Sequence, residues 1–162
     1  MCYRVVQCQV AQGNLIHDYC DSYARLAKLL YNAALFRIRQ IFTGYDKDSR
    51  TDNEEEVFAE VDLLQRTYPS IKVKRVISYS HLEKLMRVTQ NPDFFAGLPM
   101  QSAQAVVKQA VTDFSNWLKA LKNYKNNPSK YLGRPQMPHY RKQDVITFSI
   151  TNQDAVLYFT DR

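Results

Sequence analysis

Residues 98–142 read LPMQSAQAVVKQAVTDFSNWLKALKNYKNNPSKYLGRPQMPHYRK, and this stretch decides the expected organisation of the chain. Apolar side chains recur at helical spacing from Ala103 to Leu121, which predicts a long amphipathic helix. Pro99 suits the first turn of such a helix, because the N–H that it lacks would have no partner there. Pro128 ends the helical pattern, and an extended, proline-interrupted segment follows it.

The second half of this stretch carries only positive charge. Residues 114–143, here called the basic segment, contain seven Lys or Arg and no Asp or Glu, whereas the whole 162-residue chain has a formal charge of +6. Acidic residues gather instead between Asp46 and Asp62. Cations that neutralise phosphates, interleaved with aromatic rings that stack on bases, are typical of nucleic-acid-binding surfaces. An ordinary solvated charged face is the alternative.

The basic segment supplies most of the candidate binding residues. Seven cations are expected to contact phosphates: Lys119, Lys122, Lys125, Lys130, Arg134, Arg141 and Lys142. His139 and Tyr140 either stack on bases or pack against the protein. Gln101 lies near the predicted helix start, where its amide either reaches a base edge or is an ordinary first-turn side chain.

The rest of the chain predicts strands at both ends and helices between them. Alternation predicts strands at residues 3–10, 145–151 and 155–159. A helical period runs from residue 15 to 42, and two capping-box matches, at 51–54 and 80–83, predict further helix starts. A lone opening strand needs partners, so we expect an α+β fold: a small sheet or β barrel with a helical bundle inserted after its first strand.

Several classes of function are disfavoured by the sequence. Cys2, Cys8 and Cys20 have no paired spacing, so neither a disulfide scaffold nor a zinc site is expected. The acidic region has no supporting metal motif, and we expect no metal or other cofactor. No residues resemble a signal peptide or a membrane span, which favours a cytosolic protein without a membrane partner.

Ordered motifs along the chain resemble the N-terminal half of TnpB, also called the OrfB transposase, of bacterial insertion sequences. The residues that carry this resemblance are 30–34 (LYNAA), 98–104 (LPMQSAQ), 114–117 (FSNW), 133–140 (GRPQMPHY) and 148–152 (FSITN). Proteins of this family are RNA-guided DNA endonucleases ancestral to the type V CRISPR nucleases.

The resemblance implies a domain organisation. Residues 1–13 would form the first strand of an oligonucleotide-binding-like β barrel, the wedge domain. Residues 14–127 would form an inserted helical recognition domain, and residues 128–162 would supply the basic extended segment and the returning wedge strands. The expected partners are a transposon-encoded guide RNA and double-stranded target DNA.

The resemblance also implies which residues read the short DNA motif beside the target. It assigns this role to Gln101 and to a strand-end turn at Thr151 and Asn152, with a neighbouring contact at Tyr79 and Ser80. Base pairing with the guide would read the remaining target sequence.

The family's nuclease half, a RuvC-like domain with a zinc ribbon, has no counterpart in these residues. Cleavage by two metal ions needs clustered carboxylates, so we expect no DNA cleavage by this chain, with Mg²⁺ and Zn²⁺ belonging only to the missing half. We expect a nucleic-acid-binding fragment that contributes guide-RNA binding and motif recognition. The alternatives are a non-catalytic regulator, which competes for transposon DNA or RNA or binds the full-length protein, and an unrelated helical enzyme domain.

Overall fold

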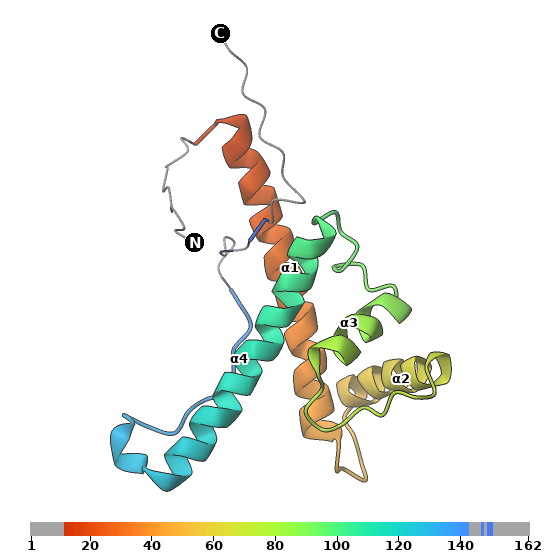
Figure 1. Cartoon of the computed structure of the whole chain (residues 1–162), viewed down its shortest axis with the longest axis vertical. Coiled ribbons are helices and arrows are strands. Elements are labelled where there is room, and N and C mark those ends of the chain that lie inside the picture. The colour runs from red at the N-terminus through yellow and green to blue at the C-terminus, as the bar shows by residue number, and fades with distance from the viewer. Residues whose placement is uncertain (1–11, 143–146, 148, 151–162) are drawn as a thin grey trace, which may run out of the picture.

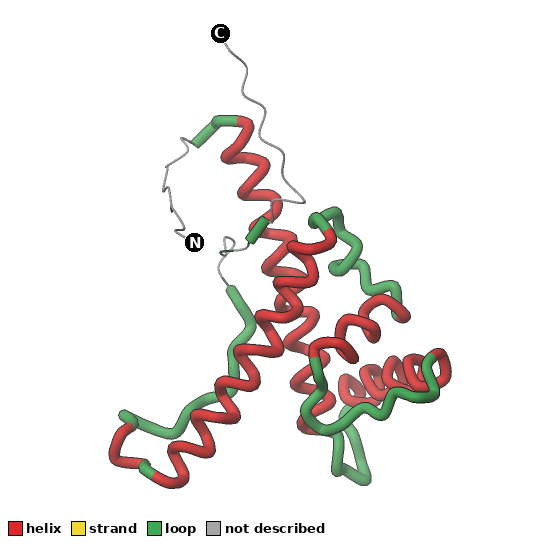
Figure 2. Tube along the Cα trace, viewed as in Figure 1, coloured by secondary structure: helices red, strands yellow, loops and turns green. Residues whose placement is uncertain are grey.

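The computed structural model describes residues 12–142, 147, 149 and 150. These residues form four α-helices and a single-turn 3-10 helix (Figure 2). The elements are α1 (Leu15–Gly44), α2 (Asp52–Thr67), α3 (Tyr79–Val88), α4 (Met100–Asn126) and η1 (Pro128–Lys130). The two long helices, α1 and α4, cross and pack together, and α2 and α3 lie to one side of them (Figure 1).

The expected α+β class is wrong for the described residues, because they contain helices and no strand or sheet. Thr147, Ser149 and Ile150, which were expected in a strand, are not paired in one. The expected strands at residues 3–10 and 155–159 lie outside the described residues. The extended residues 131–142, here called the return segment, pack on helices through side-chain bonds. Pro135 and Pro138 have no N–H to give to a strand ladder.

The core is built where α1 and α4 present their apolar stripes to each other. On α1 the buried positions are spaced by three or four residues, as an amphipathic helix requires: Ala27, Leu30, Ala34, Ile38 and Ile41. On α4 the corresponding series is Ala103, Val107, Ala110 and Phe114. Alanines recur in both stripes, and their small side chains let the two helix backbones come close together.

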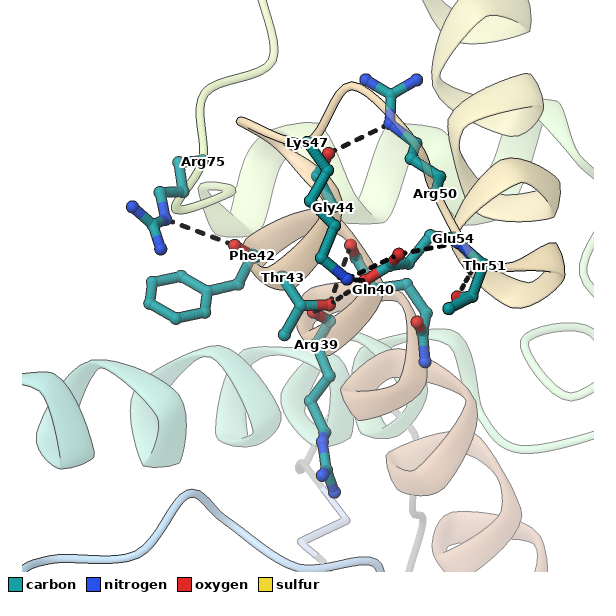
Figure 3. Close-up of polar contacts among 10 residues, drawn as sticks. All are labelled: Arg39, Gln40, Phe42, Thr43, Gly44, Lys47, Arg50, Thr51, Glu54 and Arg75. Carbon is teal, nitrogen blue, oxygen red and sulfur yellow. Dashed lines mark hydrogen bonds and ion pairs between the residues drawn. The ribbon is translucent and has the colours of Figure 1, made fainter.

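The predicted capping box at the start of α2 is confirmed. The Thr51 hydroxyl accepts a hydrogen bond from the Glu54 backbone N–H, and the Glu54 carboxylate accepts one from the Thr51 N–H. Glu54 also accepts hydrogen bonds from Thr43 Oγ1 at 2.7 Å and from Lys47 Nζ at 2.7 Å (Figure 3). We call this arrangement the α1–α2 junction. Gly44 permits it, since a Cβ there would lie 3.0 Å from the Phe58 ring.

The second predicted capping box is wrong by two residues. The N-cap of α3 is Ser78, whose hydroxyl accepts from the His81 N–H, and Ser80 already lies within the helix. Glu83 does not turn back toward the helix start. Its carboxylate instead pairs with Arg87 one turn along the helix and accepts a hydrogen bond from Gln104 on α4.

The C-terminal half of α4 extends beyond the core, away from α2 and α3 (Figure 1). The last buried residue of α4 is Phe114, although the helix continues to Asn126. The helix end agrees with the sequence expectation that residues 126–128 terminate it. The return segment then runs back along α4 (Figure 1). This geometry leaves three turns of α4 available to form a surface feature.

Candidate nucleic-acid interface

An open groove of about 470 Å³ lies beside the C-terminal half of α4. Its lining combines apolar and aromatic side chains with cations: Phe42, Arg75, Trp117, Leu118, Leu121, Lys122, Lys125 and Arg134. These residues come from the end of α1, the loop before α3, one face of α4 and the return segment. Its volume is within the range of about 300–1,000 Å³ that is typical of small-molecule sites.

Helical geometry explains why these residues of α4 share the groove. Trp117, Leu121 and Lys125 are spaced four residues apart, so they lie one above another on the same face of the helix. Leu118 and Lys122 flank that row. Lys119 falls outside this series and does not line the groove. The helix therefore divides the predicted phosphate contacts between two faces.

The three cations Lys122, Lys125 and Arg134 are exposed. Among the residues that the structure describes, no carboxylate lies within ion-pair distance of any of them. The basic segment contains no acid that could neutralise them from within. Their positive charge is therefore available to an anion from outside the chain.

Arg75 has a different environment from these three cations. Its Nε donates to the Phe42 carbonyl oxygen at 3.2 Å, and its Nη1 lies 3.1 Å from the Asp46 carboxylate. Its guanidinium lies 4.5 Å from the centre of the Phe42 ring. The Phe42 ring in turn contacts the Trp117 ring edge to face, with 5.7 Å between the ring centres. The Arg75 guanidinium therefore has hydrogen-bond partners within the chain, and Asp46 balances its charge.

The return segment is fastened at two points, and this fixes the position of Arg134. The Trp117 indole N–H donates to the Pro135 carbonyl oxygen at 3.2 Å. Asn32 on α1 accepts from the Arg141 N–H at 2.8 Å and donates to the Arg141 carbonyl oxygen at 3.0 Å. Asn32 therefore replaces the strand partner that an extended backbone would otherwise need.

Arg141 also has internal side-chain partners, unlike the groove cations. Its guanidinium lies 4.0 Å from the centre of the Tyr31 ring and 3.7 Å from the Asp113 carboxylate. The Tyr31 hydroxyl donates to Asp113 at 2.7 Å. Burial, together with this hydrogen bond, raises the pKa of Tyr31 to about 12, so Tyr31 remains a neutral donor at neutral pH. A small cavity of about 120 Å³ lies against Tyr31 and Arg141.

The other predicted residues of the basic segment lie outside the groove. Lys119, Lys130 and Lys142 are exposed. The Tyr140 ring lies 5.0 Å from the Arg39 guanidinium, and His139 lies 3.2 Å from the Gln136 amide oxygen. These positions leave both phosphate contact and stacking as predictions.

The predicted base-reading residues that the structure describes do not gather at one place. Gln101 is half-buried in the first turn of α4. The end of α3 that lies near Gln101 is its C-terminal end, because Arg87 contacts Met100, the neighbour of Gln101. Tyr79 and Ser80 are at the opposite end of α3, about 10 Å from Arg87 along the helix axis. Burial, with the charge of Glu83, raises the pKa of Tyr79. The other two predicted base contacts, Thr151 and Asn152, lie outside the described residues.

Sequence reasoning missed several residues of the groove and its support. Phe42 and Arg75 line the groove, yet they are 33 residues apart and far from the basic segment along the chain. Asp113, just before the basic segment, holds Tyr31 and Arg141. No local motif marks any of them. Only the acid-free composition of the basic segment pointed toward the groove.

Within the part of the chain that the structure describes, no three His, Cys, Asp or Glu side chains gather as a metal site would require. None of the helices there combines the length and apolar character needed to cross a bilayer.

The chain was compared with protein families, curated sequences and solved structures. No family model, no curated protein and no solved structure matches it. The resemblance to TnpB therefore stays a prediction.

Proposed function

We propose that this chain binds nucleic acid through the groove beside α4. The observation that carries the proposal is the meeting of three unpaired cations, Lys122, Lys125 and Arg134, with an aromatic and apolar floor. Cations without internal partners release counterions when they meet phosphates, which favours binding. Held rings and aliphatic side chains beside them suit bases or sugars.

The sequence resemblance extends this proposal to a biological setting. On that basis the ligands would be a transposon-encoded guide RNA and the duplex beside the target site, in the bacterial cytosol. The chain would then contribute binding and not cleavage. The groove supports binding to a polyanion in general, whereas the identity of the RNA and of the duplex rests on the resemblance alone.

The test is a titration at several salt concentrations with transposon-end RNA, duplex DNA and single-stranded DNA. Replacing Lys122, Lys125 and Arg134 by Gln should weaken binding and reduce the slope of log K against log salt by about 2 to 3. That change corresponds to the loss of three phosphate contacts.

A matched control removes the same charge elsewhere. Arg66, Lys72 and Lys108 are exposed cations outside the groove, and replacing them by Gln also removes two lysines and one arginine. If this control variant loses as much affinity as the groove variant, binding depends on net charge and the proposed interface is wrong. The same conclusion follows if the parent chain binds none of the three ligands.

A further inference from the structure

We propose that the groove takes an unpaired base, so that the stretch of nucleic acid inside the groove is single-stranded, whereas a duplex would be bound only outside it. This inference rests on the proposed function. It assigns separate tasks to the two halves of the lining: Lys122, Lys125 and Arg134 hold the phosphates, while Trp117 and Leu121 contact the base.

The apolar lining of the groove consists of Phe42, Trp117, Leu118 and Leu121, here called the apolar floor, and these side chains line the same groove as the cations. A duplex keeps its bases stacked inside, so only its sugars could reach these apolar side chains. An unpaired base brings a larger apolar face, which can enter the groove and displace more water from them.

Two planar rings of the groove are packed together: the centres of the Phe42 and Trp117 rings are 5.7 Å apart in an edge-to-face contact, and the indole N–H donates to the Pro135 carbonyl oxygen. The Arg75 guanidinium contacts the Phe42 carbonyl oxygen and the exposed Asp46 carboxylate. Because the two rings are packed together before any ligand arrives, little of their side-chain entropy is lost when a base packs on them.

The cations of the groove differ in charge balance. Asp46 balances the charge of Arg75, so this arginine is better suited to stacking than to holding a phosphate. Lys122, Lys125 and Arg134 have no carboxylate partner among the described residues. They line the same groove as the apolar side chains, as a nucleotide requires: charge for the phosphate beside a surface for the base.

The experiment uses Trp117, which is the only tryptophan in the chain, as a fluorescent reporter inside the groove. Four probes are titrated against the whole chain: a short oligothymidine, the same strand with abasic positions, a duplex of equal length, and an aromatic-containing acidic peptide of similar charge. The base-containing strand should quench the fluorescence of Trp117. It should also bind about tenfold more tightly than the abasic strand.

The outcomes separate this inference from the proposed function. Equal affinity and equal quenching for the base-containing and abasic strands would overturn the inference and leave nucleic-acid binding intact. Quenching by the duplex as strong as that by the single strand would also overturn it. Absence of binding to every oligonucleotide would overturn both proposals, and so would preferential binding of the acidic peptide.

A variant tests the floor directly. Leu121 lines the groove but is not part of the buried core, so Leu121→Gln should fold normally. In this variant the ratio of the affinities for the base-containing and abasic strands should fall from about ten toward one. The slope of log K against log salt should stay unchanged. Leu63→Gln, at an exposed leucine on α2, is the matched control and should keep the preference. An unchanged preference in folded Leu121→Gln would contradict the inference.

Discussion

The α1–α2 junction and the groove beside α4 both contain many charges, but they use them in opposite ways. At the junction Glu54 is almost fully buried and accepts hydrogen bonds from Thr43, Lys47 and Thr51. In the groove, Lys122 and Lys125 are exposed and have no ion-pair partner among the described residues. Removing one partner of an internally satisfied charge destabilises a fold, because the other charge is left buried and unpaired, whereas exposed charges without a partner remain available to a ligand.

The largest effect should come from a buried ion pair near the junction. Arg37 on α1 donates to both Glu60 oxygens on α2, at 2.7 and 2.6 Å, and the two side chains are only 11% and 17% exposed. Arg37→Met would leave the Glu60 carboxylate without its partner in a poorly hydrated place. We expect the free energy of unfolding, measured in urea, to fall by about 3 kcal/mol.

Two further variants check this explanation. Adding Glu60→Leu to Arg37→Met should recover much of the loss, because no unpaired charge then remains. The exposed pair Arg25–Asp21 serves as a control, and Arg25→Met should cost less than about 1 kcal/mol. If the Arg37 and Arg25 variants were equally stable, burial would not be what separates the two kinds of charge.

The next effect concerns pH and Glu54. Hydrogen bonds from Lys47, then from the Thr51 backbone and Thr43, lower the pKa of Glu54 to about 2 from its usual 4.5. Its stabilising contribution is therefore complete above pH 4.5 and is lost as the pH falls toward 2. At pH 7 the urea midpoint of Glu54→Gln should be lower than that of the parent chain. Between pH 5 and pH 2.5 the midpoint of Glu54→Gln should fall less than the midpoint of the parent does.

The exposed Glu55, in the same first turn of α2, is the control for this measurement. Glu55→Gln should follow the acid profile of the parent chain. Parallel acid profiles for Glu54→Gln and the parent would show that the junction does not depend on an ionised Glu54.

A smaller effect is expected where the return segment is fastened. Asn32→Ala removes both hydrogen bonds to the Arg141 backbone, and we expect a loss of about 1 to 2 kcal/mol. Trypsin should also cleave faster after Lys130. Asn32→Asp keeps the acceptor for the Arg141 N–H and should fall between Asn32→Ala and the parent. Equal trypsin cleavage in all three chains would mean that this bond pair does not hold the segment.

The helices were predictable because their signals are local. Residues spaced by three and four positions mark the core faces of α1 and α4, and Thr51 with Glu54 marks the start of α2. The predicted start of α3 is two residues too late, because the prediction rested on Ser80 followed by Glu83 as a capping box. In the structure Ser78 is the N-cap, and Glu83 binds Arg87 and Gln104 instead.

The groove was only half predictable. The basic segment identified Lys122, Lys125 and Arg134 through its lack of acids. Its other wall needs Phe42 and Arg75, which tertiary packing brings there and no sequence spacing reveals. The separation of Arg141 from the groove cations likewise depends on Tyr31 and Asp113, contributed by two different helices. The fold class was wrong for the described residues, which contain helices and no strand. Local alternation predicted a strand that includes Thr147, Ser149 and Ile150, but alternation does not supply the neighbouring strand that pairing requires.

The smallest effect on stability should come from the groove itself. Replacing Lys122, Lys125 and Arg134 by Gln removes charges without internal partners, so the free energy of unfolding should change by less than about 0.5 kcal/mol. The same variant should bind single-stranded nucleic acid much more weakly than the parent chain does, and this difference should be largest at low salt. A large loss of stability would instead mean that these cations hold the return segment against α4, and the contrast between junction and groove would then disappear.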